Sequence, residues 1–384
     1  MLTCKYSKFS IPKNVTYLNC AYMAPLLKSV EKAGVRGVRM KRNPADIHPG
    51  DFFASTKNLR NEFANLIGAT DSYSIAIIPS VSYGLSTVAK NIRIKAGEHV
   101  LVAAEQFPSN YYPWQALCSE TRAELKIVSP DKRSKDRGKQ WNEKLVDSIN
   151  SNTRVVAIAH THWTDGTLFD LQALRKRTSE VNALLIIDGT QSVGAFPFNV
   201  QTIQPDALIC AAYKWLLGPY SIGLAYFGQY FMDGKPLEEN WINRLDSENF
   251  SSLVDYKSEY QPGALRFSVG EQSNFILAPM ALKAIEQINR WGVDNIQLYC
   301  KSIAEPAIAT LREKGFAIED AAYRGSHLFG IRHPKKGVLE DAKEKLLKSR
   351  IHVSFRGDSI RVAPHVYNDG EDLHRLTKIL SSTV

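Results

Sequence analysis

The sequence lacks the features that mark several classes of protein. Its five cysteines are scattered along 384 residues and include no CxxC pair, which argues against a zinc site and against a disulfide framework. No stretch approaches the roughly 18 uninterrupted apolar residues of a membrane-spanning helix, and residues 1–12 contain no apolar signal-peptide core. These absences predict a cytoplasmic protein with no membrane partner.

Basic residues are in excess, but they form no stripe. The chain has 48 Lys and Arg residues against 39 Asp and Glu residues, a net charge of +9. Its densest basic cluster, residues 132–139, is interrupted by Asp136 and Gly138. We interpret this cluster as a solvated loop and therefore expect no nucleic-acid partner.

Short apolar runs alternate with helical patterns up to about residue 260. The runs predict buried strands, and apolar residues at helical spacing predict helices. The predicted strands are 75–78, 100–102, 125–128, 154–159, 183–187 and 207–212, and the predicted helices include 83–91, 112–119 and 171–181. This alternation is typical of βαβ units and predicts an α/β fold with a mostly parallel sheet.

The pattern changes near residues 260–263, which contain Pro262 and Gly263 and mark a domain boundary. Beyond it the sequence predicts two long helices, three short strands and a last helix, over residues 275–291, 294–314, 327–331, 351–355, 360–363 and 371–380. We expect these elements to form a smaller α+β domain.

An aspartate and a lysine follow two of the predicted strands. Asp188 closes the run 183–187, and Lys214 comes shortly after the run 207–212. Both charges lie where a buried strand leaves the core, which is where open α/β sheets bind their ligands. An acid suits a cationic ring nitrogen and a primary amine suits an aldehyde, and pyridoxal 5'-phosphate (PLP) carries both groups. The two residues therefore predict a PLP site.

Several further motifs occur in a consistent order. They are Tyr17-Leu-Asn-Cys-Ala21, Glu105-Gln-Phe107, Asp188-Gly-Thr-Gln-Ser192, Tyr213-Lys-Trp215 and Ser359-Ile-Arg-Val-Ala-Pro-His365. Together they resemble the class V aminotransferase family of PLP-dependent enzymes, and the resemblance extends from about residue 17 to residue 380. Within that family the overall likeness is to isopenicillin N epimerase-like proteins.

The resemblance implies the fold and the assembly. It implies fold type I, with a large cofactor-binding domain over residues 17–260 that contains a mostly parallel seven-stranded sheet. Residues 1–16 and 261–384 would form the small domain. It also implies a homodimer with two active sites at the subunit interface.

The resemblance further implies roles for residues around the cofactor ring. Lys214 would form the Schiff base, because lysine is the side chain that supplies a primary amine. Asp188 would pair with the pyridine nitrogen and keep it protonated. Gln191 would hydrogen-bond the ring hydroxyl, and Phe107 would stack on the ring face in the place where many relatives have histidine.

The implied phosphate site departs from the family pattern. The hydroxyl of Ser82 and the backbone of Val81 would meet the phosphate at a helix N-terminus. Ala211 stands where relatives often have a serine ligand. Tyr213, or a residue of the 270–274 segment of the partner subunit such as Ser273, is expected to compensate.

On the substrate side, the resemblance implies that Arg361 grips the α-carboxylate, since a planar guanidinium matches a carboxylate with two hydrogen bonds. Tyr22 and Trp163 would line the same pocket. The substrates would be an amino acid and, for transamination, a 2-oxo acid.

The reaction is narrowed by a missing cysteine. Cysteine desulfurases of this family carry a nucleophilic cysteine shortly before the carboxylate-binding arginine, and residues 351–361 contain none. We therefore expect chemistry at the α-carbon of an amino acid, of the aminotransferase or epimerase type. A PLP-dependent C–S or C–C lyase is the alternative.

An alternative from another class is a metal-dependent hydrolase. His160 and His162 alternate on a predicted strand, and Asp188 follows a neighbouring one, so the three could form a two-histidine, one-carboxylate site. The PLP hypothesis itself involves no metal.

Overall fold

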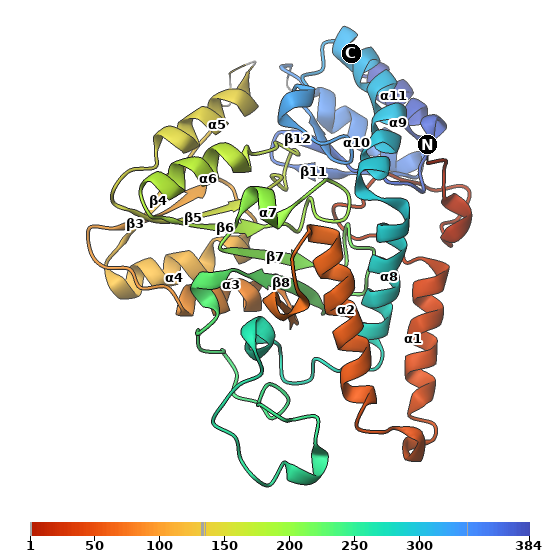
Figure 1. The fold of residues 1–384 in the computed structure, drawn as a ribbon. Helices are drawn as coiled ribbons and strands as arrows, with labels where there is room; N and C mark the ends of the chain where they lie inside the picture. The colour runs from red at the N-terminus through yellow and green to blue at the C-terminus, as the bar shows by residue number, and fades with distance from the viewer. Residues whose placement is uncertain (1, 132–133, 135, 336) are drawn as a thin grey trace.

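A seven-stranded sheet lies at the centre of the computed structural model, which describes residues 2–131, 134, 136–335 and 337–384 (Figure 1). Its spatial order is β2 (Ile75–Ile78), β8 (Gly223–Phe227), β7 (Ala207–Ala211), β6 (Leu184–Asp188), β5 (Thr153–Ala159), β3 (His99–Ala103) and β4 (Glu124–Val128). Only β8 runs antiparallel to its described neighbours. The prediction of a mostly parallel seven-stranded sheet is confirmed.

Both faces of this sheet are covered, which explains why its strands are apolar at nearly every position. Successive side chains of a strand point to opposite faces. In β6, Leu185 and Ile187 join one core cluster, whereas Leu184 and Ile186 join the other. The strands β2, β3, β5 and β7 divide their side chains in the same way.

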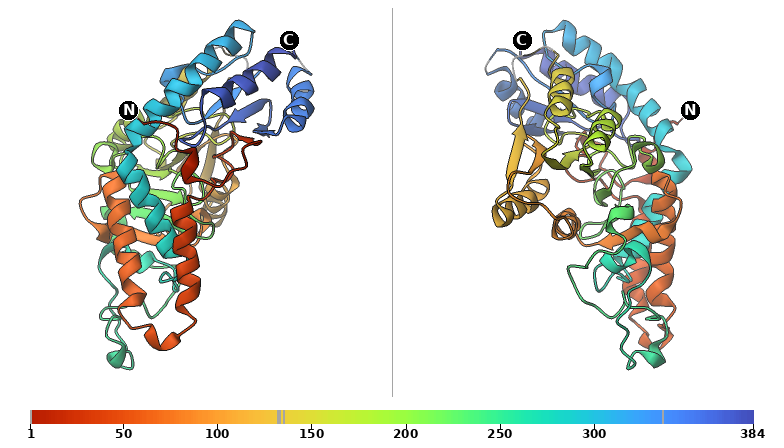
Figure 2. Two further views of the ribbon diagram at one scale, coloured as in Figure 1. Left: turned by 90° about the vertical axis from the view of Figure 1, so that its right-hand side faces the viewer. Right: turned by 60° about the vertical axis from the view of Figure 1, so that its left-hand side comes forward.

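Different helices supply the two layers. Helices α3 (Val81–Lys90) and α4 (Tyr112–Thr121) contribute to one core cluster. The other cluster includes side chains of α1 (Lys28–Met40), α2 (Asp51–Ile67), α5 (Arg137–Asp147), α6 (Leu171–Glu180), α7 (Val200–Ile203) and α8 (Leu277–Trp291). Helix α8 lies beside α1 and α2 in all views (Figures 1 and 2).

The C-terminal part builds a second core around a three-stranded antiparallel sheet, in the order β11 (Ser354–Arg356), β12 (Ser359–Val362) and β9 (Phe329–Ile331). Helices α9 (Val293–Glu313), α10 (Val338–Lys348) and α11 (Gly370–Ser381) pack in this core. The N-terminal segment joins it, because β1 (Thr16–Tyr17) pairs with β10 (Ile351–His352).

The proposed division into residues 17–260 and residues 1–16 with 261–384 stays a prediction. Helix α8 lies after residue 260, yet its buried side chains belong to the core of the large sheet. None of the described helices combines the length and the apolar character that crossing a membrane requires.

The interpretation of residues 132–139 as a solvated loop is wrong for Arg137. This residue begins α5, is 6% exposed, and pairs with the buried Asp165. A partner that lies in the loop after β5 therefore draws the guanidinium inward. Lys132, Arg133 and Lys135 lie outside the described residues.

Candidate active site

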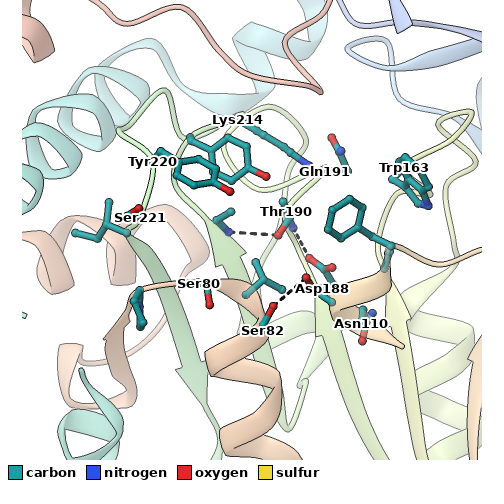
Figure 3. Close-up of a pocket in the computed structure, with 18 of the residues that line it drawn as sticks. Ser80, Ser82, Asn110, Trp163, Asp188, Thr190, Gln191, Lys214, Tyr220 and Ser221 are labelled. Atoms are coloured by element: carbon teal, nitrogen blue, oxygen red, sulfur yellow. Dashed lines mark hydrogen bonds between the residues drawn. The ribbon is translucent and has the colours of Figure 1, made fainter. Parts of the chain in front are cut away.

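The predicted site residues gather at the carboxyl edge of the large sheet. The ends of β2, β3, β5, β6 and β7 open into a cavity of about 380 Å³. Eight predicted residues line it: Val81, Ser82, Phe107, Trp163, Asp188, Gln191, Tyr213 and Lys214 (Figure 3). The expectation that both charged residues meet at one sheet edge is confirmed in position, since parallel strands end on the same side.

Lys214 reaches the cavity from the turn after β7. Its side chain is buried, and its Nζ lies 5.3 Å from the ring centroid of Phe107 and 5.4 Å from that of Tyr213. Burial, together with the charge of Arg361, lowers the pKa of Lys214 to about 8. The amine is therefore closer to its neutral, nucleophilic form at neutral pH than an ordinary lysine.

Asp188 is the last residue of β6 and is buried at the cavity wall. Its Oδ1 accepts the backbone N–H of Thr190 at 3.0 Å. Burial raises the pKa of this carboxyl group. A cation placed beside it would favour the ionised form, which is the relationship expected for a protonated ring nitrogen.

Gln191 is held at both ends of its amide. Its Nε2 donates to the carbonyl oxygen of Ala21 at 3.1 Å, and its Oε1 accepts the indole N–H of Trp215 at 2.9 Å. Thr190, which the sequence reasoning passed over, also lines the cavity, and its hydroxyl accepts the N–H of Ala211 at 3.3 Å. Its position between Asp188 and Gln191 in the sequence is the signal that could have identified it as a site residue.

Two aromatic rings form one wall. Phe107 and Trp163 meet edge to face with their centroids 5.4 Å apart, and both line the cavity. The indole N–H of Trp163 donates to the carbonyl oxygen of Glu105 at 2.7 Å. The wall therefore offers a ring face to a flat ligand beside Lys214.

The N-terminus of α3 forms the opposite end of the cavity. Ser80 caps the helix by accepting the N–H of Tyr83 at 3.1 Å, while the first-turn amides of Val81 and Ser82 have no acceptor within the helix. The hydroxyl of Ser82 donates to that of Ser109 at 2.9 Å. This end suits an anion because hydroxyls, free amides and the helix dipole converge there.

Ala211 lines the same end, and two residues that the sequence reasoning did not single out lie nearby. They are Tyr220, whose ring centroid is 4.6 Å from that of Tyr213, and Ser221, which adopts φ +65°. Burial raises the pKa of Tyr213 to about 12, so its phenol stays protonated. No local sequence pattern predicts that Ser221 lines the cavity, because its position depends on the left-handed backbone conformation that it adopts.

Arg361 is not among the residues that line the cavity, but it contacts the backbone of one of them. It is 1% exposed; its Nη1 donates to the carbonyl oxygen of Trp163 at 2.6 Å and its Nη2 to the hydroxyl of Ser354 at 3.3 Å. Its Nε has no hydrogen-bond partner among the described residues. Burial and the charge of Arg356 lower the pKa of Arg361 to about 9. A guanidinium buried without an acid is prepared for a carboxylate that arrives from outside.

Two predicted residues lie away from this cavity. Tyr22 is 57% exposed, and Ser273 is half-buried in the turn before α8. Neither lines the cavity of its own chain. Their roles stay predictions.

The metal-site alternative is wrong. The part of the chain that the structure describes contains no group of three His, Cys, Asp or Glu side chains arranged to hold a metal ion. Both ring nitrogens of His162 are already engaged, with Thr164 Oγ1 at 2.8 Å and the carbonyl oxygen of Ala104 at 3.1 Å. His160 packs against Phe196 and Phe198 instead.

A buried lysine amine, a carboxylate at a neighbouring strand end, an aromatic wall and a helix N-terminus define a PLP-dependent fold type I enzyme. The family model for class-V aminotransferases matches residues 48–375, and the chain belongs to this family. PLP is therefore its cofactor, and the residues present fit it. Among the described residues the Nζ of Lys214 makes no hydrogen bond or ion pair and lies near two aromatic rings, so the amine is free to hold the aldehyde.

Known proteins agree with this assignment. The chain is 28% identical over 331 residues to "Uncharacterized aminotransferase YcbU" of Bacillus subtilis (strain 168), covering 86% of this chain and 84% of that protein. It is 24% identical over 344 residues to a probable cysteine desulfurase of Methanothermobacter thermautotrophicus, covering 84% and 82%. A solved structure of a C-DES mutant with glycine covalently linked to the PLP cofactor superposes with a TM-score of 0.86 at 18% identity, over 99% of each chain. The last likeness supports the fold.

Proposed function

We propose that this enzyme acts at the α-carbon of an amino acid, by transamination or epimerisation. The observation that supports the proposal is the juxtaposition of Lys214 and Arg361. A buried amine with pKa about 8 borders the cavity, and a buried guanidinium with an unpartnered Nε bonds the backbone of Trp163, which lines it. The amine can move a proton at the α-carbon while the guanidinium holds the α-carboxylate.

When bound, PLP supplies an aldehyde for the substrate amine and a ring that withdraws electrons from the α-carbon. The protein residues do the rest. Asp188 would hold the ring nitrogen, Gln191 the ring hydroxyl, and Val81 and Ser82 the phosphate, with Ser80 and Ser221 in place of the hydroxyl that Ala211 lacks. Lys214 would accept the α-proton. It would return the proton to the α-carbon in epimerisation, or to the cofactor carbon that carries the aldehyde in transamination.

Two features argue against a cysteine desulfurase reaction: the state of the cysteine nearest in charge to Lys214, and the short hairpin before Arg361. Cys20 is the cysteine whose charge would interact with Lys214, but it is buried and its pKa is raised to about 12. Strands β11 and β12 are joined by Gly357 and Asp358 alone, because Arg356 pairs with Ser359. This tight hairpin leaves no loop on which a nucleophilic cysteine could travel.

We also propose the homodimer that the family resemblance implies. Exposed apolar side chains gather on the segment 241–256: Trp241, Leu245, Val254 and Tyr256 are 40%, 39%, 79% and 96% exposed. Exposed apolar groups of this kind mark association surfaces. In such a dimer the turn that carries Ser273 would serve the cavity of the other subunit. The cytoplasmic location stays a prediction from the sequence.

The test is a substrate screen of the PLP-loaded enzyme with single L-amino acids in deuterated water. Transamination releases a 2-oxo acid, and epimerisation produces the D-isomer with deuterium at the α-carbon. Either result supports the proposal. Sulfide released from cysteine together with a protein persulfide would contradict it, and a product of C–S or C–C cleavage would replace it with the lyase alternative.

A further inference from the structure

Two arginines on neighbouring strands converge on one residue of the cavity wall, Trp163. Arg356 ends β11 and Arg361 lies in β12, paired antiparallel to it. The guanidinium carbon of Arg356 lies 5.5 Å from the ring centroid of Trp163, and Nη1 of Arg361 bonds the carbonyl oxygen of the same residue. Trp163 itself lines the cavity, to the right of Asp188 in Figure 3.

Neither arginine has an acidic partner among the described residues. Arg356 donates to the carbonyl oxygen of its neighbour Phe355 at 3.0 Å, and its Nε is buried without any hydrogen-bond partner. Arg361 likewise contacts only neutral oxygens, and its Nε is unpartnered. Three other arginines do pair with acids, whereas the buried Arg60 bonds the neutral amide oxygen of Gln272 at 3.0 Å.

Arg137 and Arg332 both pair with Asp165, and Arg324 pairs with Glu305 at 2.8 Å. Burying a cation without a counter-charge costs free energy. Two guanidiniums without acidic partners, whose charges act on Lys214, therefore leave uncompensated positive charge in this part of the protein. Both also depress the pKa of Lys214, which shows that their charges are felt at the amine.

One α-carboxylate can satisfy one of these arginines. The cofactor phosphate is assigned to the other end of the cavity, at the N-terminus of α3, so it does not supply the second anion. Resting on the proposed function, we propose that Arg356 binds a carboxylate on the substrate side chain and that the preferred substrates are dicarboxylic amino acids. Arg361, which is the more buried of the two, keeps the α-carboxylate.

The order of residues along the cavity wall supports this assignment of the two carboxylates to the two arginines. Lys214 faces Phe107, Phe107 meets Trp163 edge to face, and Arg356 stands over the Trp163 ring. A substrate held at its α-carbon near Lys214 would extend its side chain along this wall toward Arg356. Stacking on the indole limits the motion of the planar guanidinium, so less freedom is lost when a carboxylate binds.

The test is calorimetric binding of unreactive acids to the PLP-loaded enzyme. Succinate and glutarate carry two carboxylates, whereas propionate and butyrate carry one. The dicarboxylates should bind about 10- to 100-fold more tightly, the range expected for one charge-assisted contact. Arg356→Gln should remove most of this difference, because it should weaken dicarboxylate binding far more than monocarboxylate binding.

Lys343→Gln is the matched control. Lys343 is exposed on α10, and its Nζ lies 5.7 Å from the ring centroid of Phe355, the residue before Arg356. The variant removes one positive charge from the same neighbourhood but nothing from the cavity, so it should keep the dicarboxylate preference. Arg356→Lys should restore part of it, because the charge returns without the planar fork.

Kinetics separate this inference from the proposed function. With Arg356→Gln, KM for aspartate or glutamate should rise far more than kcat falls, and this rise in KM should greatly exceed the change in KM for asparagine and glutamine. Equal binding of mono- and dicarboxylates to the unaltered enzyme would overturn the role of Arg356. If no amino acid reacts at all, the proposed function fails, yet the calorimetric comparison still decides the role of Arg356.

Discussion

Trp215, which follows Lys214 in the sequence, donates its indole N–H to Oε1 of Gln191 at 2.9 Å. Trp215 is fully buried, and its ring centroid lies 4.6 Å from that of His327. The bond fixes the orientation of the Gln191 amide, with Oε1 toward Trp215 and Nε2 toward Ala21. A buried core residue, Trp215, thus sets the orientation of a side chain that lines the cavity, Gln191.

Trp215→Phe should therefore loosen the cofactor as well as the fold. Losing the donor leaves a buried carbonyl oxygen unsatisfied, at about 1–3 kcal/mol of unfolding free energy. With Gln191 free to rotate, the dissociation constant of PLP should rise roughly fivefold, equivalent to about 1 kcal/mol. Denaturant unfolding and PLP titration measure the two effects.

Trp141→Phe is the control for this prediction. Trp141 is also buried and donates its indole N–H at 2.8 Å, but to the carbonyl oxygen of Val128. It should lower stability by a similar amount and leave PLP affinity unchanged. Equal losses of PLP affinity in both variants would show that Trp215 acts only through general stability.

Lys214→Ala should prevent the covalent, borohydride-reducible attachment of PLP and abolish all turnover. Lys214→Arg keeps a positive charge but offers no primary amine, so it should behave in the same way. Borohydride treatment followed by peptide mass spectrometry should place the reduced pyridoxyl group on Lys214 in the unaltered enzyme. A label on any other lysine would remove Lys214 from its proposed role.

Asp188→Asn tests charge separately from shape. The amide can still accept the Thr190 N–H, so the fold should persist. The ring nitrogen would lose its counter-ion, and exchange of the substrate α-proton with solvent should slow on the order of 100-fold. Unchanged exchange, followed by NMR in deuterated water, would contradict the pairing of Asp188 with the ring nitrogen.

Asp165→Asn should destabilise the protein without altering the cavity, because Asp165 joins Arg137 and Arg332 away from it. Burial alone would raise the pKa of Asp165, but the nearby His162, whose Nδ1 lies 3.6 Å from Oδ1, and the two arginine charges lower it well below its usual value. Its stabilisation is thus complete above the unfolded pKa and is lost as pH falls toward the lower folded pKa. We expect a loss of about 3–5 kcal/mol at neutral pH, the range for breaking a buried pair.

The strands that build the site were predictable because both sheet faces are covered and nearly every position is apolar. Helix α5 escaped detection since it begins within a basic cluster and shows only a narrow apolar stripe, with Trp141 and Leu145 among its few buried residues. Strand β8 and helix α10 were likewise not predicted. Asp188 and Lys214 could be found from their places after strands, but no local pattern marks Arg356. Its role depends on the pairing of β11 with β12 and on Trp163, which is distant in sequence.

The rate at which the protein without cofactor takes up PLP should report the lowered pKa of Lys214. Only the neutral amine attacks the aldehyde, so the rate should rise with pH and level off above about 8, whereas an ordinary lysine levels off above about 10.4. Stopped-flow absorbance between about pH 6 and pH 10 measures this profile, with N-acetyl-lysine as the reference amine. Because Arg356 contributes to the lowered pKa, Arg356→Gln should move the plateau to higher pH, and Lys343→Gln should leave it in place. A plateau that stays near 8 in the Arg356 variant would mean that burial and the charge of Arg361 lower the pKa of Lys214 without help from Arg356.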